Sequence, residues 1–384
     1  MKNKYGWEIK KLGEIYDVRD GTHDSPKYVE NGYALITSKN LKEDYISFEN
    51  LNYITEQDYA NINKRSKVDV GDILFAMIGT IGNPVVVKNE VNFAIKNVAL
   101  FKVSETQNSY FLKYYLSSKF VIEKMTKNAK GATQKFVGLN YLRNFTIPVP
   151  SHSIQHQIVS ELDALSDIIT KKKQQLEELD KLAQATFYDM FGDPVSNERS
   201  WNKDSILNVA PAKAYKGNVK SKEGKFWLLN LDMVESNTGK IISINMVDKH
   251  EIGNSTTSFN EENVLYSKLR PYLNKVVNPE SSGYATSELL PLLPKDGVLN
   301  KVFLTQLLRS RFFVNYIQEK VAGAKMPRVS MDIFRAFKVI LPPLSLQIQF
   351  SDRIEGIEKQ EQFISKSIDE VQQLFDYTMD KYFN

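Results

Sequence analysis

The stretch that decides the fold is Asn144-Phe-Thr-Ile-Pro-Val-Pro150, which leads into Ile154-Gln-His-Gln157. The pattern returns 192 residues later as Phe337-Lys-Val-Ile-Leu-Pro342, leading into Leu346-Gln-Ile-Gln349. Since 192 is half of the 384 residues, the sequence consists of two copies of one unit. Each copy is expected to hold a globular module that ends in a proline-bounded strand and continues into a helix.

Other matching segments extend the repeat toward the start of each copy. Gly71-Asp-Ile-Leu-Phe75 corresponds to Asn263-Val-Leu-Tyr266, and Trp7-Glu-Ile-Lys-Lys-Leu12 corresponds to Trp201-Asn-Lys-Asp-Ser-Ile206. The chain is therefore expected to divide into module one (1–150), a central helix (151–190), module two (191–342) and a C-terminal helix (343–384).

The modules have the pattern of mixed α and β structure. Short runs rich in Val, Ile and Phe, bounded by Gly, Pro or Asn, predict strands over 72–78, 84–88, 94–103 and 145–149. Helical periodicity predicts one helix over 110–125 and a counterpart over 303–317. The expected fold class is α+β, with Ser153 and Ser345 as candidate N-caps of the two long helices.

Both long helices carry a heptad pattern. Spacings of three and four residues connect Leu162, Leu165, Ile169, Lys172, Leu176, Leu179, Ala183 and Thr186 in the first, and Ile354, Ile357, Glu361, Ile364, Ile368, Val371, Phe375 and Thr378 in the second. Such narrow seams favour a coiled coil between the two helices, with pseudo-two-fold symmetry relating the copies. The alternative is two amphipathic helices that each pack on their own module.

Charge matching predicts the direction and register of this coiled coil. Each seam contains one charged position, Lys172 or Glu361, and an unpaired charge there would be costly. An antiparallel alignment that sets Lys172 opposite Glu361 also pairs Ile169 with Ile364 and Leu165 with Ile368. A parallel alignment would leave both charges facing aliphatic side chains.

The absence of cysteine excludes disulfides, thiolate nucleophiles and cysteine-ligated metal centres. It also fits a reducing compartment. The longest apolar run, Ile73 to Ile81, is far shorter than a membrane span. We therefore expect a cytoplasmic protein with no membrane partner.

Charge is segregated along the same boundaries. Modules one and two carry excesses of five and six positive charges, whereas the two helices carry excesses of three and four negative charges. Basic modules are typical of proteins that bind the phosphates of double-stranded DNA, and acidic helices would face a protein partner instead.

With these features in place, the chain resembles the specificity subunits of type I restriction-modification systems. The resemblance rests on the order, twice over, of weak motifs such as Asp20-Gly-Thr-His-Asp-Ser-Pro26, Ile147-Pro-Val-Pro150 and Met190-Phe-Gly-Asp-Pro194 before Trp201. It implies that each module is a target-recognition domain for half of a bipartite DNA site. It also implies helices that pair antiparallel as a spacer, two methyltransferase subunits docked on them, and motor-nuclease restriction subunits in the larger complex.

Motifs for catalysis are missing from the sequence. It has no Asn/Asp-Pro-Pro-aromatic loop for adenine methylation and no phosphate loop ending in Gly-Lys-Ser/Thr. We therefore expect no enzyme activity and no cofactor in this chain, while the partner methyltransferase would use S-adenosylmethionine. His152 and His156 have a spacing that can bind zinc, but no third ligand is evident, so no metal is expected.

Candidate DNA-binding residues are polar and basic side chains expected on loops between strands. They are Thr22, His23, Lys39, Asn40, Arg65, Lys67, Lys130, Gln134 and Lys135 in module one, and Lys216, Lys220, Lys222, Lys268, Arg270, Arg309, Arg311, Lys325 and Arg328 in module two. The rival function is a structural adaptor whose duplicated basic modules bind acidic protein surfaces.

Overall fold

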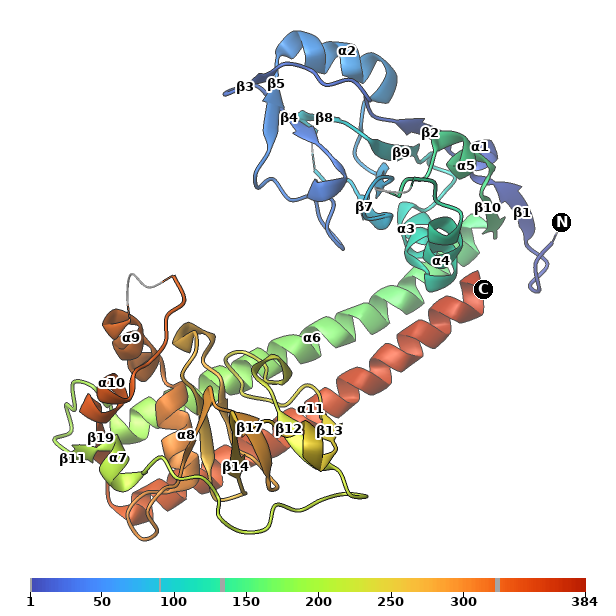
Figure 1. Ribbon diagram of the computed structural model, residues 1–384. Coiled ribbons are helices and arrows are strands. Elements are labelled where there is room, and N and C mark those ends of the chain that lie inside the picture. Colours follow the sequence, from blue (N-terminus) through green and yellow to red (C-terminus); the bar gives the residue numbers. More distant parts are fainter. Residues whose placement is uncertain (1, 90, 132–134, 322–324) are drawn as a thin grey trace. The chain divides into compact units, whose positions relative to one another are not determined.

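The computed structural model describes residues 2–89, 91–131, 135–321 and 325–384. The chain forms two compact units, Met1–Lys172 with Ser367–Asn384, and Lys173–Lys366. Each unit combines one module with parts of the two long helices, α6 (His152–Phe191) and α11 (Leu344–Phe383) (Figure 1). Helices and strands are mixed in both units, in agreement with the predicted α+β class.

The described residues of module one form two four-stranded sheets and a separate pair of strands. The first is antiparallel, with the strand order β2 (Asp17–Asp20), β9 (Val98–Lys102), β6 (Ile73–Ala76) and β7 (Gly82–Val86). The second has the order β3 (Tyr28–Val29), β5 (Asn52–Ile54), β4 (Tyr33–Ile36) and β8 (Phe93–Ile95), and its β4 and β8 are parallel. The remaining elements are β1 (Glu8–Lys11), which pairs with β10 (Thr146–Val149), and α1 (Leu12–Ile15), η1 (Ser38–Asn40), α2 (Glu56–Ser66), α3 (Ser109–Ser117), α4 (Lys119–Lys127) and α5 (Leu139–Asn144).

Module two repeats most of this plan. One sheet has the order β16 (Val276–Val277), β15 (Val264–Ser267) and β18 (Leu289–Leu292). The other has the order β13 (Met246–Val247), β12 (Phe226–Leu229), β17 (Gly283–Thr286) and β14 (Thr256–Phe259), and its β12 and β17 are parallel. The remaining elements are β11 (Asn202–Ser205), which pairs with β19 (Lys338–Leu341), and α7 (Ile206–Val209), η2 (Leu231–Met233), η3 (Lys249–Glu251), η4 (Pro271–Leu273), α8 (Lys301–Arg309), α9 (Arg311–Lys320) and α10 (Met331–Ala336).

The two modules differ in the element that precedes the equivalent strands β6 and β15. In module one the chain forms α2, whose Tyr59 stacks on Tyr33 with ring centroids 4.0 Å apart. In module two the corresponding chain forms β14, which adds to the sheet by pairing with β17. One position beside a shared pair of parallel strands is thus filled by a helix in one copy and by a strand in the other.

Three predicted elements are divided in the structure. The helix expected over 110–125 is broken at Ser118, whose hydroxyl donates to the carbonyl of Tyr115 at 2.8 Å. Its counterpart is broken in the same way at Ser310. Serine hydroxyls can replace a backbone partner locally, and both serines adopt extended backbone angles. The strand expected over 94–103 is divided at Asn97, which has a positive φ of 54°.

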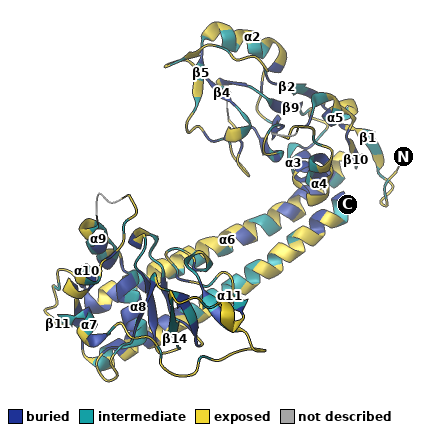
Figure 2. Ribbon diagram, viewed as in Figure 1, coloured by how far each residue is buried: buried dark blue, intermediate teal, exposed yellow. Residues whose placement is uncertain are grey.

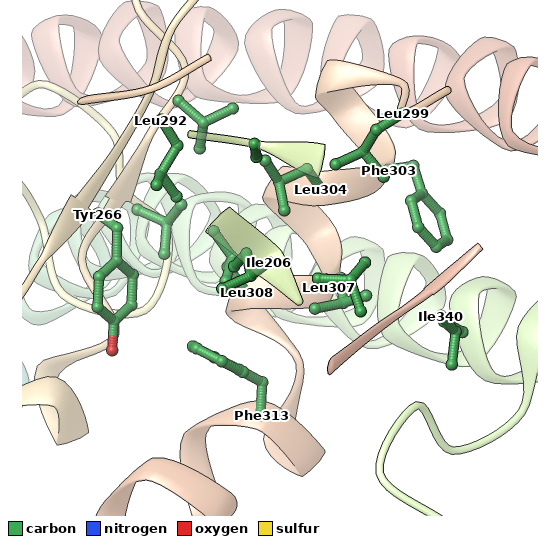
Figure 3. Close-up of a cluster of buried hydrophobic side chains, with 14 of the residues drawn as sticks. Ile206, Tyr266, Leu292, Leu299, Phe303, Leu304, Leu307, Leu308, Phe313 and Ile340 are labelled. Carbon is green, nitrogen blue, oxygen red and sulfur yellow. The ribbon is translucent and has the colours of Figure 1, made fainter. Parts of the chain in front are cut away.

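The core of module two is dominated by large apolar side chains from α8, α9 and the strands. Figure 3 shows part of it, with Ile206, Tyr266, Leu292, Leu299, Phe303, Leu304, Leu307, Leu308, Phe313 and Ile340 labelled. Phe187 and Phe191 of α6 and Phe350 of α11 join the same cluster. Both long helices therefore complete the core of the unit to which these segments belong.

The long helices pack together in each unit. In the first, the carboxylate of Glu161 on α6 accepts a hydrogen bond of 2.7 Å from the hydroxyl of Tyr382 on α11. In the second, the rings of Phe187 and Phe350 lie 5.6 Å apart. The early part of one helix thus contacts the late part of the other in both units.

All residues of the two predicted seams are buried or half-buried, in the banding that Figure 2 shows along α6 and α11. Ile169 and Ile354 are buried, and Leu165, Ile364, Ile368 and Lys172 are half-buried. Half-buried Glu361 forms an ion pair of 3.1 Å with Lys240 of module two. The pairing of Lys172 with Glu361 stays a prediction.

A buried glutamine attaches the start of each long helix to its own module. In the first copy, Gln155 accepts a hydrogen bond of 2.9 Å from the backbone N–H of Asn108 and donates one of 3.1 Å to the carbonyl of Pro150. In the second, Gln347 makes the same two contacts with Asn300 and Pro342, each at 2.9 Å. We call this arrangement the glutamine clasp.

The predicted N-caps are wrong, because Ser153 and Ser345 lie inside the helices. In the first copy the hydroxyl of Ser151 accepts from the N–H of Ile154 at 3.5 Å instead. Among the described residues, no helix has both the length and the apolar character needed to cross a membrane.

Candidate nucleic-acid interface

The antiparallel sheet of module one brings several candidate loops to one of its ends. Asp20 at the end of β2 lies opposite Ala99, and Ala76 at the end of β6 lies opposite Val98 and Gly82. The loops 21–25, 77–81 and 96–97 therefore emerge side by side. We call this region the strand-end surface.

Thr22 and His23 lie on the strand-end surface. The backbone carbonyl of Thr22 accepts from the N–H of Asn97 at 3.1 Å, which ties the two loops together. His23 bridges them with its ring, since Nδ1 lies 2.8 Å from the side-chain oxygen of Asn97 and Nε2 lies 2.8 Å from the carboxylate of Asp20. Both ring nitrogens thus face oxygen atoms.

Lys39 and Asn40 lie on the turn that adjoins these loops, because the hydroxyl of Ser38 donates to the carbonyl of Asn97 at 3.0 Å. Lys39 is exposed, as expected for a DNA contact. Asn40 is buried, and its side chain bonds to Thr37 and to the carbonyl of Ser47. The amide of Asn40 therefore holds the turn together rather than being presented to a base.

Exposed Lys130 and Lys135 join the same surface through backbone pairing. Lys130 pairs with Phe136, and Phe136 in turn pairs with Ile78, which lies just after β6. The carbonyl of Lys135 accepts from the N–H of Gly79 at 3.0 Å. Gln134, the third candidate in this segment, lies outside the described residues.

Arg65 and Lys67 lie near the end of α2, but their side chains pair with carboxylates at opposite ends of the sheet. Arg65 forms an ion pair with Asp20 and so reaches the strand-end surface. Lys67 pairs with Asp69, which also contacts Lys102 at the opposite end of β9. The structure does not bring Lys67 together with the other candidates of module one.

In module two, four candidates gather at the equivalent place. Leu269, just after β15, pairs with Arg328, and the N–H of Arg270 donates to the carbonyl of Pro327 at 2.8 Å. The carbonyl of Lys268 accepts from the N–H of Val329 at 2.9 Å. Exposed Lys325 belongs to the same segment as Arg328, so this turn and segment collect Lys268, Arg270, Lys325 and Arg328.

The remaining candidates of module two lie elsewhere. Lys216, Lys220 and Lys222 are exposed on the loop before β12, and Lys220 is 3.3 Å from Glu261. Arg311 is exposed at the start of α9. Arg309 is half-buried and donates two hydrogen bonds, of 2.6 and 3.2 Å, to the carbonyl of Val276, so its guanidinium is engaged inside the protein.

Three residues of the strand-end surface are not among the candidates predicted from the sequence: Asp20, Lys96 and Asn97. Asp20 is 6% exposed, and Lys96 donates to the hydroxyl of Ser25 at 2.9 Å. The only available signal for Asp20 was its place in the motif Asp20-Gly-Thr-His. The described ranges contain no group of three or more His, Cys, Asp or Glu side chains arranged to bind a metal ion.

The contacts of His23 give a testable pKa. Hydrogen bonds to Asn97 and then to Asp20 favour the imidazolium and raise the pKa of His23 above its ordinary value. Both ring nitrogens donate only in the imidazolium, so the two hydrogen bonds coexist at low pH, and one of them is lost as the pH rises through the raised pKa because the neutral ring keeps a single N–H. We expect NMR titration of the ring to show this raised pKa and Asp20→Asn to lower it. An unchanged pKa in Asp20→Asn would contradict the assigned contact.

Comparison with known proteins gives a consistent result. Residues 4–180 match the family model of the type I restriction modification DNA specificity domain. The chain is 22% identical over 281 residues to the type I restriction enzyme EcoDI specificity subunit of Escherichia coli; the alignment covers 64% of this chain and 62% of that subunit, less than two thirds of its length. It is 24% identical over 378 residues to the MjaIX specificity subunit of Methanocaldococcus jannaschii, covering 91% of this chain and 86% of that one.

The fold is similar to a solved structure over the full chain. The S subunit of a type I restriction-modification system from M. genitalium aligns with a TM-score of 0.58 at 14% identity, covering 100% of this chain and 98% of that one. The family model, the curated relatives and the solved fold all agree with the resemblance carried by the repeated motifs. The chain is thus similar to type I restriction-modification specificity subunits, with residues 4–180 matching their DNA specificity domain and the whole chain sharing the fold of a solved S subunit.

Proposed function

We propose that this chain is the non-catalytic DNA-recognition subunit of a type I restriction-modification complex. The observation that carries the proposal is the same in both copies. Exposed Lys130 and Lys135 in module one, and exposed Lys325 and Arg328 in module two, lie on segments that pair with the turn after the equivalent strands β6 and β15. Cations placed beside a strand-end turn can hold a DNA backbone while neighbouring loops contact bases.

Each module is proposed to read one half of a bipartite target, and the two halves are proposed to differ. Asp20-Gly-Thr-His in module one corresponds to Ala214-Tyr-Lys-Gly in module two. The helix α2 and the strand β14 also give the modules different surfaces at corresponding places. Different side chains and different elements would select different bases, so the whole target would be asymmetric.

The helices are proposed to form an antiparallel coiled coil with pseudo-two-fold symmetry that separates the two half-sites. The seam from Ile158 to Thr186 would span about 42 Å at about 1.5 Å per residue, roughly 12 base pairs of DNA. Two methyltransferase subunits, which would use S-adenosylmethionine, are proposed to dock on these acidic helices, and restriction subunits would join that assembly. The register that pairs Lys172 with Glu361 belongs to this proposal.

The proposal is tested by selecting bound duplexes from a random pool with the full-length chain. We expect an enriched motif with two unlike half-sites separated by bases without preference. Mapping of methylated adenines by the chain together with its methyltransferase partner should return the same motif. Binding without any sequence preference above the salt-dependent background would support the adaptor instead.

Module cations and helix lysines should respond differently to replacement. Lys135→Ala or Lys325→Ala is expected to weaken binding to all duplexes and to reduce the salt dependence by about one unit for each lost phosphate contact. Lys171→Ala and Lys173→Ala, on the exposed surface of α6, are the matched controls and should change neither quantity. Equal losses in the controls would contradict the assignment of the helices to protein partners.

A further inference from the structure

The strand-end surface contains a buried carboxylate with two basic partners. Asp20 has an 8% exposed side chain, and its two oxygens are divided between Arg65 and His23. A carboxylate withdrawn from water needs such partners. The ion pair with Asp20 holds one side of the Arg65 guanidinium against the protein, although the Arg65 side chain is 64% exposed.

The contact with Asp20 also orients the N–H groups of Arg65 that it does not use. Its Nη2 group bonds to the carboxylate and the backbone carbonyl of Asp20, and the described residues offer no acceptor to its Nε or Nη1 groups. The helix that holds Arg65 is itself fastened, because Arg19 donates to the carbonyl of Arg65 at 3.1 Å. The guanidinium is thus oriented by a carboxylate behind it and retains N–H donors for a ligand.

We propose that Arg65, positioned by Asp20, is a specificity-determining residue that reads a guanine in the half-site of module one. This inference rests on the proposed DNA-recognition function. Arginine makes the commonest specific base contact, a bidentate one to the O6 and N7 atoms of guanine. A guanidinium that is already oriented has less conformational freedom to lose when the contact forms.

The neighbours of Arg65 suit this role. Lys39, Lys130 and Lys135 are exposed on loops of the same strand-end surface, where they can hold the DNA backbone. Asn97 and Asp20 hold His23 between them, which keeps the loop 21–25 in place beside Arg65. Arg65 therefore lies among residues that can anchor phosphates without contacting bases.

Module two lacks this arrangement. The segment that corresponds to Asp20-Gly-Thr-His is Ala214-Tyr-Lys-Gly, which has no carboxylate at the first position. The element that carries Arg65 in module one, α2, is replaced there by β14. The guanine contact is therefore specific to one half-site, and the other half-site serves as an internal control.

The test compares base preferences of full-length variants, selected from a random duplex pool and measured on duplexes with single-base changes. We expect Arg65→Ala to lose about tenfold or more of the preference for guanine at one position of one half-site. Arg65→Lys should lose the same preference while keeping the salt dependence, because lysine retains the charge but not the bidentate fork. Asp20→Asn should weaken the preference at that same position.

Lys64→Ala is the matched control, since Lys64 is an exposed cation on the same turn of α2 and bonds only to Asn61 within the described chain. It should leave every base preference unchanged. If Arg65→Ala weakened binding to all sequences equally, or altered only the unfolding midpoint, the guanine contact would be overturned while DNA recognition stood. A wild-type chain with no sequence preference would overturn both.

Discussion

Replacing Lys102 by leucine is expected to destabilise the first unit by about 3–5 kcal/mol, because it removes the cation from a buried carboxylate. Asp72, with a side chain only 4% exposed, lies 2.5 Å from the ammonium of Lys102. The same carboxylate also accepts a hydrogen bond of 2.7 Å from the backbone N–H of Asp69. Hydrogen–deuterium exchange of β6 and β9 over a denaturant series would measure the loss in this unit alone.

In module two, the positions that correspond to Asp72 and Lys102 are both uncharged. Asn263, which corresponds to Asp72, is 1% exposed and caps the equivalent turn by accepting from the N–H of Asn260 at 3.0 Å. Leu293 corresponds to Lys102 at the same offset of 191 residues. The double replacement Asp72→Asn with Lys102→Leu is therefore expected to recover most of the stability. Equal destabilisation by the single and double replacements would contradict the role of the buried charge.

The pH dependence gives a further check on the same pair. Burial raises the pKa of Asp72, and the hydrogen bond from Lys102 opposes that rise. Without Lys102 the pKa should rise further, so the folded state would bind a proton more readily than the unfolded chain. The stability of Lys102→Leu relative to wild type should then improve as the pH falls toward the raised pKa, and worsen as the pH rises.

Removing the glutamine of a clasp is the second replacement that we expect to lower the free energy of unfolding strongly. Gln155→Ala would leave the N–H of Asn108 and the carbonyl of Pro150 without their partner at a buried site. We expect a loss of about 2–4 kcal/mol in the first unit, and a similar loss in the second unit for Gln347→Ala.

The sequence provides matched controls for the clasp. Gln157 and Gln349 lie two residues farther along the same helices and are exposed. Their replacement by alanine should change the free energy of unfolding by less than about 0.5 kcal/mol. Denaturant unfolding resolved by hydrogen exchange would compare all four variants. Equal effects at Gln155 and Gln157 would show that helix propensity, and not the clasp, is responsible.

The sequence was most informative where the structure is periodic. The spacing of three and four residues identified seam positions that the structure buries wholly or partly, because one face of a long helix must leave water. The repeat also located the strands that precede each long helix, including β10 and β19. The predictions of one continuous helix over 110–125 and one continuous strand over 94–103 were wrong because of local interactions. A side-chain hydrogen bond interrupts the helix at Ser118, and a positive φ interrupts the strand at Asn97.

The candidate interface was harder to predict, since a basic residue on a loop has the same appearance in sequence whether its side chain is exposed or engaged. Lys130 and Lys325 are exposed, whereas Arg309 donates to a carbonyl inside module two. Asn40, another candidate for DNA contact, uses its amide to hold a turn. These outcomes depend on contacts between segments distant in sequence, and periodicity carries no information about such contacts.

The exchange of α2 for β14 bears on how such a protein can change over evolutionary time. The parallel pairs β4–β8 and β12–β17 are kept in both copies, although the neighbouring segment takes a different secondary structure in each. Insertions, deletions or recombination between Ile54 and Asp72 can therefore alter the outer surface while the strands beneath retain their partners. New specificities would then arise by replacing a whole segment at once, without passing through a series of destabilised intermediates.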